Sequence, residues 1–300
     1  MVLRIVSLLP SATELLFFIL DRLNAGHDEP VAILVGRSHE CDWPEIYREL
    51  PVLTSSRIHG EASCAEIDKQ VREELAAGYS LYSVDTELLL SLSPDVVVTQ
   101  SLCQVCTVDY AMVVDLLADA DPKPRILDTN PSSFHDVFAD IRRISNAIGA
   151  ADVGEQLIKE LQARVDAALA HVKPTGLKIG FCEWTDPIFC GGHWTPQMIE
   201  MAGALHPLNP TRGPGLGAWP SRTIGVDEFV AMDPDLIIVA PCGMELDRSK
   251  EETLAIIAQP WWQENLTDKP LFVVNGNHIF HFTPDDCASL SSISSGTIPE

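Results

Sequence analysis

The stretch from Ala150 to Val172 constrains the fold most strongly, because it predicts one long amphipathic helix with α/β sequence patterns on both sides. Five apolar residues recur at every fourth position with charged residues between them, which is typical of a helix with one buried face. They are Val153, Leu157, Leu161, Val165 and Leu169. Gly149 precedes the stretch and Pro174 follows it, as expected at helix boundaries. We predict that this helix connects two halves.

Both halves alternate short apolar runs with helical segments, which predicts parallel sheets with right-handed crossovers. The predicted organisation is an N-terminal α/β lobe over residues 1–149, the linking helix over 150–172 and a C-terminal α/β lobe over 173–300. The Ser-rich, polar end of the chain predicts an irregular tail from about residue 284. Ser93-Pro94-Asp95 and Asp233-Pro234-Asp235 each precede an apolar run, which indicates one structural device used once in each half.

The start of the chain predicts a strand, a turn and a helix. Leu3 to Leu9 is a mostly apolar run typical of a buried strand. Ser11 followed by Glu14 three residues later has the spacing of a capping box, so we expect Ser11 to be the N-cap of the first helix.

The charge of the chain limits its partners. Its 20 basic and 43 acidic residues give a formal net charge of −23, which disfavours nucleic acid and anionic membrane surfaces. No apolar block reaches the roughly 20 residues of a membrane span, so membrane insertion is not expected. Neither a continuous signal block nor a lipid-attachment motif is seen. We therefore expect a cytoplasmic protein, or a periplasmic or extracellular one if an export signal precedes this sequence.

Clusters of polar, aromatic and sulfur residues follow almost every predicted strand, and the carboxyl ends of parallel strands are where ligands bind. Four tryptophans are expected in such loops, beside Gly, Pro or His: Trp43, Trp184, Trp194 and Trp219. Loop placement favours contact with a flat, partly apolar ligand over packing inside an element. The Gly/Pro segment around Gly215 follows no strand, so a phosphate-binding loop, and with it a nucleotide ligand, is not expected.

Cysteine and acidic residues leave several interpretations open. Cys103-x-x-Cys106 fits a redox pair, half a metal site, a disulfide or two small apolar side chains, and no second ligand pair of similar spacing accompanies it. A composite metal site for zinc or iron could use Cys41, Cys103, Cys106 and His193 if the halves approach. Glu183 could pair with Asp186 in acid–base chemistry, but a helix cap or a hydrogen bond in the cleft is favoured, since no nucleophile elbow and no third orienting group accompany the two.

Six motifs occur in order along the chain and together carry a family resemblance. They are the segment from Arg4 to Glu14, Ser38-His39-Glu40-Cys41-Asp42, Ser56-Arg57-Ile58, the segment from Thr99 to Cys106, Glu183-Trp184-x-Asp186-Pro187 with Gly192-His193-Trp194, and Ala240-Pro241-Cys242-Gly243. They resemble the cobalamin-binding branch of the class III ABC-transporter substrate-binding proteins, the receptors of ATP-driven importers of vitamin B12, haem and iron chelates. The resemblance covers residues 3 to about 280.

The resemblance implies two Rossmann-like lobes joined by a single rigid helix, little hinge closure and a ligand cleft between the lobes. It implies no enzymatic activity. The expected ligand is cobalamin or a related tetrapyrrole or metal chelate, haem and iron chelates included. If the chain is exported, the expected partners are the membrane subunits of an ABC transporter.

Position by position, the resemblance places a set of residues around the ligand: His39, Trp43, Arg57, Gln100, Trp184, His193, Trp194 and Asn277. Glu183, as a hydrogen-bonding residue, and Trp219, as a loop aromatic, are further candidates. An imidazole from His39 or His193 could also reach the cobalt or iron of the ligand. The alternative function is an intracellular metal-binding protein or metal-dependent enzyme that uses the Cys and His residues named above.

Overall fold

The computed structural model describes residues 1–101 and 108–280, and this part of the chain forms two compact units. Within the described residues, the first comprises Met1–His59, Val71–Asn130 and Asp136–Gln162, and the second comprises Gly60–Gln70, Pro131–His135 and the chain from Ala163 onward. The chain therefore passes from one unit to the other five times. The predicted boundaries did not include the two short segments that join the second unit, and the predicted tail lies outside the described residues.

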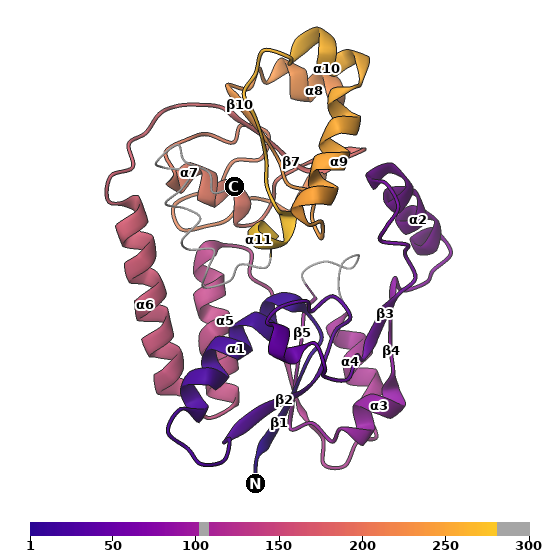
Figure 1. Ribbon diagram of the computed structural model, residues 1–300, viewed down its shortest axis with the longest axis vertical. Coiled ribbons are helices and arrows are strands. Elements are labelled where there is room, and N and C mark those ends of the chain that lie inside the picture. Colours follow the sequence, from indigo (N-terminus) through magenta and orange to yellow (C-terminus); the bar gives the residue numbers. More distant parts are fainter. Residues whose placement is uncertain (102–107, 281–300) are drawn as a thin grey trace. The chain divides into compact units, whose positions relative to one another are not determined.

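A parallel sheet that includes β1, β2 and β5 lies in the first unit (Figure 1), as the alternating pattern predicted. Its strand order is β2-β1-β5-β6. The strands are β1 (Leu3–Ser7), β2 (Ala32–Arg37), β5 (Val96–Thr99) and β6 (Arg125–Asp128). All three pairings are parallel. Val6 and Val97 are fully buried, so the apolar runs form the core of this unit.

Helices and a small second sheet complete the first unit. The helical elements are α1 (Pro10–Asn24), the 3₁₀ turn η1 (Glu45–Tyr47), α3 (Thr86–Ser91), α4 (Tyr110–Leu116) and α5 (Phe134–Ala147). The second sheet pairs β3 (Thr54–Ser56) with β4 (Tyr82–Val84) in antiparallel fashion. The expectation of parallel pairing alone was therefore wrong for these two strands. They precede and follow α2 (Cys64–Ala76), and the chain returns along β3 in the opposite direction.

The predicted capping box at Ser11 is wrong. Helix α1 begins one residue earlier, at Pro10, and its N-cap is Leu9, which makes no side-chain cap hydrogen bond. The fixed φ angle of proline suits the first helical position, and its missing N–H is one that no helix would bond there. Pro10 therefore sets the start of the helix, and Ser11 lies within the first turn.

The predicted linking helix is α6, which extends over Ala151–Leu169. Its predicted stripe is largely inside, with Leu157, Leu161 and Val165 at most 2% exposed. Residues up to Gln162 belong to the first unit and later ones to the second. The helix packs closely on α5, because a Cβ atom at Gly154 would lie 2.0 Å from the Ser145 hydroxyl oxygen.

The second unit contains a five-stranded mixed sheet with the order β11-β10-β7-β8-β9. Its strands are β7 (Ile179–Thr185), β8 (Ile188–Cys190), β9 (Arg222–Thr223), β10 (Leu236–Val239) and β11 (Leu271–Val273). The pairings of β10 with β7 and β11 are parallel, as predicted, whereas β8 pairs with β7 and β9 in antiparallel fashion. The helices are α7 (Thr195–Met201), α8 (Val226–Ala231), α9 (Leu246–Ile257), α10 (Pro260–Asn265) and α11 (Gly276–Phe280).

The repeated Pro-Asp device is confirmed in both units. In the first, an Asp95 carboxylate oxygen accepts a hydrogen bond from the backbone N–H of Arg4 at 2.8 Å, and the Asp95 N–H donates to the Arg4 carbonyl. In the second, Asp235 makes the same two bonds with Lys178, also at 2.8 Å through the carboxylate. Each aspartate thus aligns the start of one strand with that of its neighbour.

Among the described helices, none combines the length and apolar character needed to cross a membrane.

Candidate functional site

The loop after β2 carries the first predicted site residues, and Arg37 at the end of the strand fixes its course. Its guanidinium group donates to the carbonyl oxygens of Ser38 at 3.0 Å, Cys41 at 3.1 Å and Arg48 at 2.7 Å. Three carbonyls spread over eleven residues are thus held by one side chain. Sequence reasoning missed this residue, although an arginine at the end of a buried strand was the available signal.

His39 in this loop is half-buried and held by Thr54. Its Nδ1 lies 2.6 Å from the Thr54 hydroxyl, which also accepts the His39 backbone N–H at 2.9 Å. The ring lies 5.7 Å from that of Tyr82. Burial lowers the pKa of His39, so the imidazole is neutral at neutral pH, which is the form that binds a metal.

Trp43 lies in the same loop and packs against α1. Its ring stacks on Phe18 at 5.6 Å and meets the edge of Phe17 at 5.1 Å. The side chain remains 38% exposed. Packing on the helix thus orients this indole while leaving part of it available to a ligand.

Cys41 differs from the other predicted residues of this loop, because it is only 3% exposed. Its sulfur lies 3.0 Å from the Thr13 hydroxyl, and burial raises the pKa of the thiol to about 12. Metals bind the thiolate, so this environment disfavours Cys41 as a ligand. Cys103 and Cys106 lie outside the described residues, and the described part of the chain contains no cluster of three or more potential metal ligands.

Arg57 and Gln100 occupy two further positions of the first unit. Arg57 is exposed, with its guanidinium carbon 5.4 Å from the centre of the Tyr79 ring. Gln100 is half-buried directly after β5. In the neighbouring position Ser101 donates to Asp128 at the end of β6 at 2.8 Å, so the ends of β5 and β6 meet as parallel strands predict.

In the second unit, Glu183 and Trp184 lie within β7. The expectation of a loop at Trp184 was wrong, because β8 pairs with β7 as far as Thr185 and so extends the strand. A Glu183 carboxylate oxygen accepts the Gly192 N–H at 3.2 Å, and its role toward a ligand stays a prediction. The Trp184 indole N–H donates to the Cys64 carbonyl at 3.0 Å. Trp184 is therefore oriented by the Gly60–Gln70 segment.

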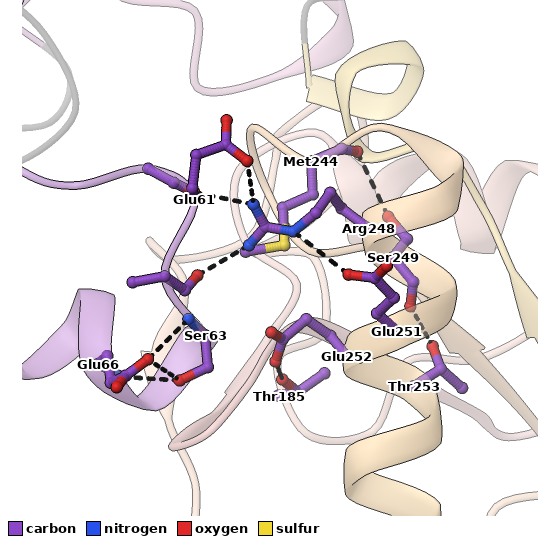
Figure 2. Close-up of polar contacts among 12 residues, drawn as sticks. Glu61, Ser63, Glu66, Thr185, Met244, Arg248, Ser249, Glu251, Glu252 and Thr253 are labelled. Carbon is purple, nitrogen blue, oxygen red and sulfur yellow. Dashed lines mark hydrogen bonds and ion pairs between the residues drawn. The ribbon is translucent and has the colours of Figure 1, made fainter.

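Arg248 on α9 fastens that segment (Figure 2). Its guanidinium group donates to the carbonyls of Gly60 at 3.1 Å and Ala62 at 2.8 Å, and lies 3.4 Å from the Glu61 carboxylate. The side chain is 25% exposed. A few residues further on, the Ser63 hydroxyl donates to Glu66 at 2.8 Å within the first turn of α2.

His193 and Trp194 follow β8, and hydrogen bonds tie this turn to the Asn209–Pro220 loop. The His193 N–H donates to the Trp219 carbonyl at 3.2 Å, and the Ala218 N–H donates to the His193 carbonyl at 2.7 Å. The side chain of Asn209, 4% exposed, donates to the carbonyls of Gly191 at 3.0 Å and Trp219 at 2.9 Å. The structure thus brings His193, Trp194 and Trp219 together.

His193 has a strained backbone within this pair of loops. Its φ angle is 54°, a conformation that costs energy for a residue with a side chain and that persists only where the surroundings impose it. Its Nδ1 is buried without a hydrogen-bond partner. Burial and the nearby Arg212 charge both lower the pKa of His193, so this imidazole is also neutral at neutral pH.

The remaining residues of the second unit differ in exposure. Trp194 is 8% exposed, and its indole N–H donates to the Ile279 carbonyl of α11 at 3.3 Å, whereas Trp219 is 64% exposed. Asn277 is half-buried in α11 and donates its backbone N–H to the Asn275 side chain at 3.0 Å. Trp194 thus anchors α11, while Trp219 is displayed to solvent.

Solved structures of known proteins match the chain over nearly its whole length. A periplasmic haem-binding protein, BhuT, in complex with two haems aligns with a TM-score of 0.69 and 16% identity over 97% of this chain and 96% of its own. The vitamin B12-binding protein BtuF of Vibrio cholerae gives 0.64 and 16% over 97% and 95%, respectively. The haem-binding protein RhuT of Roseiflexus sp. RS-1 gives 0.65 and 20% over 98% and 97%. The chain has the fold of these periplasmic binding proteins.

The binding-protein fold confirms the predicted α/β class and the family resemblance at the level of fold. No protein-family model and no curated protein sequence matches the chain. The residues that sequence reasoning missed, Arg37, Asn209 and Arg248, share one property. Each donates hydrogen bonds to backbone carbonyls of a loop. Because every residue has such a carbonyl, the sequence does not show which one a side chain will contact.

Proposed function

We propose that this chain is the non-catalytic, ligand-binding component of an ABC importer and that its ligand is a tetrapyrrole, either cobalamin or haem. The observation that carries the proposal is the His193, Trp194 and Trp219 cluster, in which hydrogen bonds hold two loops of the second unit together. A firmly held surface with aromatic side chains suits a flat, largely apolar ring.

The first unit carries candidate ligand-contacting residues of its own. His39, Trp43, Arg57 and Gln100 follow strands of its sheet or border them, and two of these side chains are already oriented by hydrogen bonds or ring contacts. Both His39 and His193 are held neutral, and a neutral imidazole is able to coordinate cobalt or iron. Each unit thus offers a neutral imidazole suited to the metal of a tetrapyrrole.

We propose the cellular location and the partners of this chain from the same matched structures. The matched haem- and B12-binding proteins named above are periplasmic, and this favours the periplasmic or extracellular alternative over the cytoplasmic location expected from the sequence. We propose that the chain delivers its ligand to the membrane subunits of a transporter. The metal-enzyme alternative receives no support from Cys41, whose thiol is buried and neutral.

Absorbance titration tests the proposal directly. The full chain is mixed with haem and, separately, with cobalamin, and the spectrum of each ligand is followed to saturation. We expect a saturable, stoichiometric spectral change with at least one ligand and no chemical turnover of it. If neither binds at micromolar concentration, the proposed function is wrong. Stoichiometric zinc or iron in the purified protein would instead support the metal-binding alternative.

A further inference from the structure

Arg212 and Trp219 form a pair on the Asn209–Pro220 loop that the sequence motifs did not single out. The guanidinium carbon of Arg212 lies 5.1 Å from the centre of the Trp219 ring. The Nε–H and backbone N–H of Arg212 both donate to the Gly217 carbonyl, at 3.0 and 3.2 Å. The cation is therefore held in place by its own loop as well as by the indole.

The loop that presents this pair is locked. A Cβ atom at Gly217 would lie 1.8 Å from the Ser132 carbonyl oxygen and 2.6 Å from that of His193. Thr211 donates its hydroxyl to Glu200 at 2.5 Å and its N–H to the same carboxylate at 2.9 Å. Together with the Asn209 hydrogen bonds, these contacts fix the loop at both ends and in the middle. Trp219, although 64% exposed, thus stands on a rigid support.

The charge of the pair is unusual for this chain. Among the described residues, the two terminal nitrogens of Arg212 have neither a hydrogen bond nor an ion-pair partner, although the chain carries 43 acidic residues against 20 basic ones. The carboxylate of Glu200 on α7 accepts the two hydrogen bonds of Thr211. His193 beside the pair is neutral. The result is one fixed positive charge with free, planar donors next to an exposed indole.

We propose that the Arg212–Trp219 pair selects a flat ring that carries carboxylate groups. The open part of the indole would contact the ring, and the free nitrogens of Arg212 would bind a carboxylate with two parallel hydrogen bonds. This inference rests on the proposed function and sharpens it. Haem carries two carboxylates on its ring, whereas the arms of cobalamin end in neutral amides, so the pair favours the haem class over cobalamin.

Matched ligands test the proposal. Binding of haem, haem dimethyl ester and cobalamin to the full chain is measured for the wild type, Arg212→Gln and Arg212→Lys. We expect Arg212→Gln to weaken haem binding about tenfold or more while leaving the ester and cobalamin within about twofold. Arg212→Lys should recover part of the loss. Lys250→Gln, which removes an exposed charge on α9, is the control and should change none of the affinities.

The outcomes separate this inference from the proposed function. If Arg212→Gln weakens haem and its ester equally, or changes neither, the carboxylate role is wrong while tetrapyrrole binding stands. If the wild type binds no tetrapyrrole, 1-pyrenebutyrate and its amide serve as a second pair of flat probes. Binding of the acid that depends on Arg212 would then retain the pair's chemistry and reject the proposed function. If the chain binds neither of these probes, both the role of the Arg212–Trp219 pair and the proposed function are wrong.

Discussion

We expect the substitution Arg248→Ala to weaken the docking of the Gly60–Gln70 segment on α9, because the Arg248 side chain makes the hydrogen bonds described above. Two carbonyls, those of Gly60 and Ala62, accept hydrogen bonds from the charged group. Hydrogen bonds to a charged group contribute about 1.5–3 kcal/mol each when buried. Because these carbonyls are only partly shielded from water, and the two nearby carboxylates are largely exposed, we expect a loss of about 1–3 kcal/mol in the local docking free energy.

Cys64 reports this opening. It is fully buried, and burial raises the pKa of its thiol to about 12, so the docked thiol reacts slowly with an alkylating reagent. Undocking would expose it and restore an ordinary thiol pKa. A change of 1–3 kcal/mol in the opening equilibrium corresponds to labelling about 5- to 150-fold faster. Pulsed alkylation followed by peptide mass spectrometry measures the rate at each cysteine separately.

Two controls make the experiment decisive. Cys182 lies in the core of the second unit at 0% exposure, so its labelling rate follows global unfolding and should not change. Glu251→Gln removes only a carboxylate 3.9 Å from Arg248 and should leave the Cys64 rate within about twofold. An unchanged Cys64 rate in Arg248→Ala, or equal acceleration at Cys64 and Cys182, would refute the reasoning.

Three further substitutions are expected to have measurable effects. Gly154→Ala should lower the free energy of unfolding, measured in urea, by about 1–3 kcal/mol, because its Cβ would lie 2.6 Å from the Ser145 Cβ. This loss is expected despite the better helix propensity of alanine. Adding Ser145→Gly to the same chain should restore the free energy of unfolding, and no recovery would contradict the packing argument. Burial raises the pKa of Asp140 from 3.8 to about 7. The folded protein therefore keeps a proton that the unfolded chain loses, and the free energy of unfolding should fall as the pH rises from about 4 to 7. Asp140→Asn should reduce this fall in urea titrations at pH 5 and pH 8, and identical pH profiles would exclude the effect. Asn209→Ala should lower the melting temperature measured by circular dichroism, because it leaves two loop carbonyls without their buried donor; an unchanged melting temperature would show that the loops do not need it.

Features with a local cause were predictable from the sequence. The four-residue period over Ala150–Val172 gave α6 with small errors at its ends, and the apolar runs gave the strands of both parallel regions. The Pro-Asp repeat could be recognised because the same residue types make the same hydrogen bonds in both units. In each case the residues that form the element also carry its signal.

Features that depend on distant partners were not predictable. Trp184 follows an apolar run and resembles the start of a loop, yet the pairing of β7 with β8 keeps it in the strand. Nothing near Gly60 indicates that Arg248 holds it. Among the candidate site residues, Trp219 was named as a loop tryptophan, and His193 as a possible metal ligand and from the family resemblance. The sequence did not show that Asn209 and Gly217 hold their loops together, because that depends on three-dimensional packing.

The five passages of the chain between the units bear on how such a protein is made. Gly60 meets Arg248 across a sequence separation of 188 residues, so the segment that orients Trp184 is synthesised long before its partner. During translation the Gly60–Gln70 segment has no docking surface until α9 has left the ribosome, and contacts of such long range form late. Neither unit is encoded by one uninterrupted stretch, so cutting the gene at the linking helix would leave each product without a piece of itself.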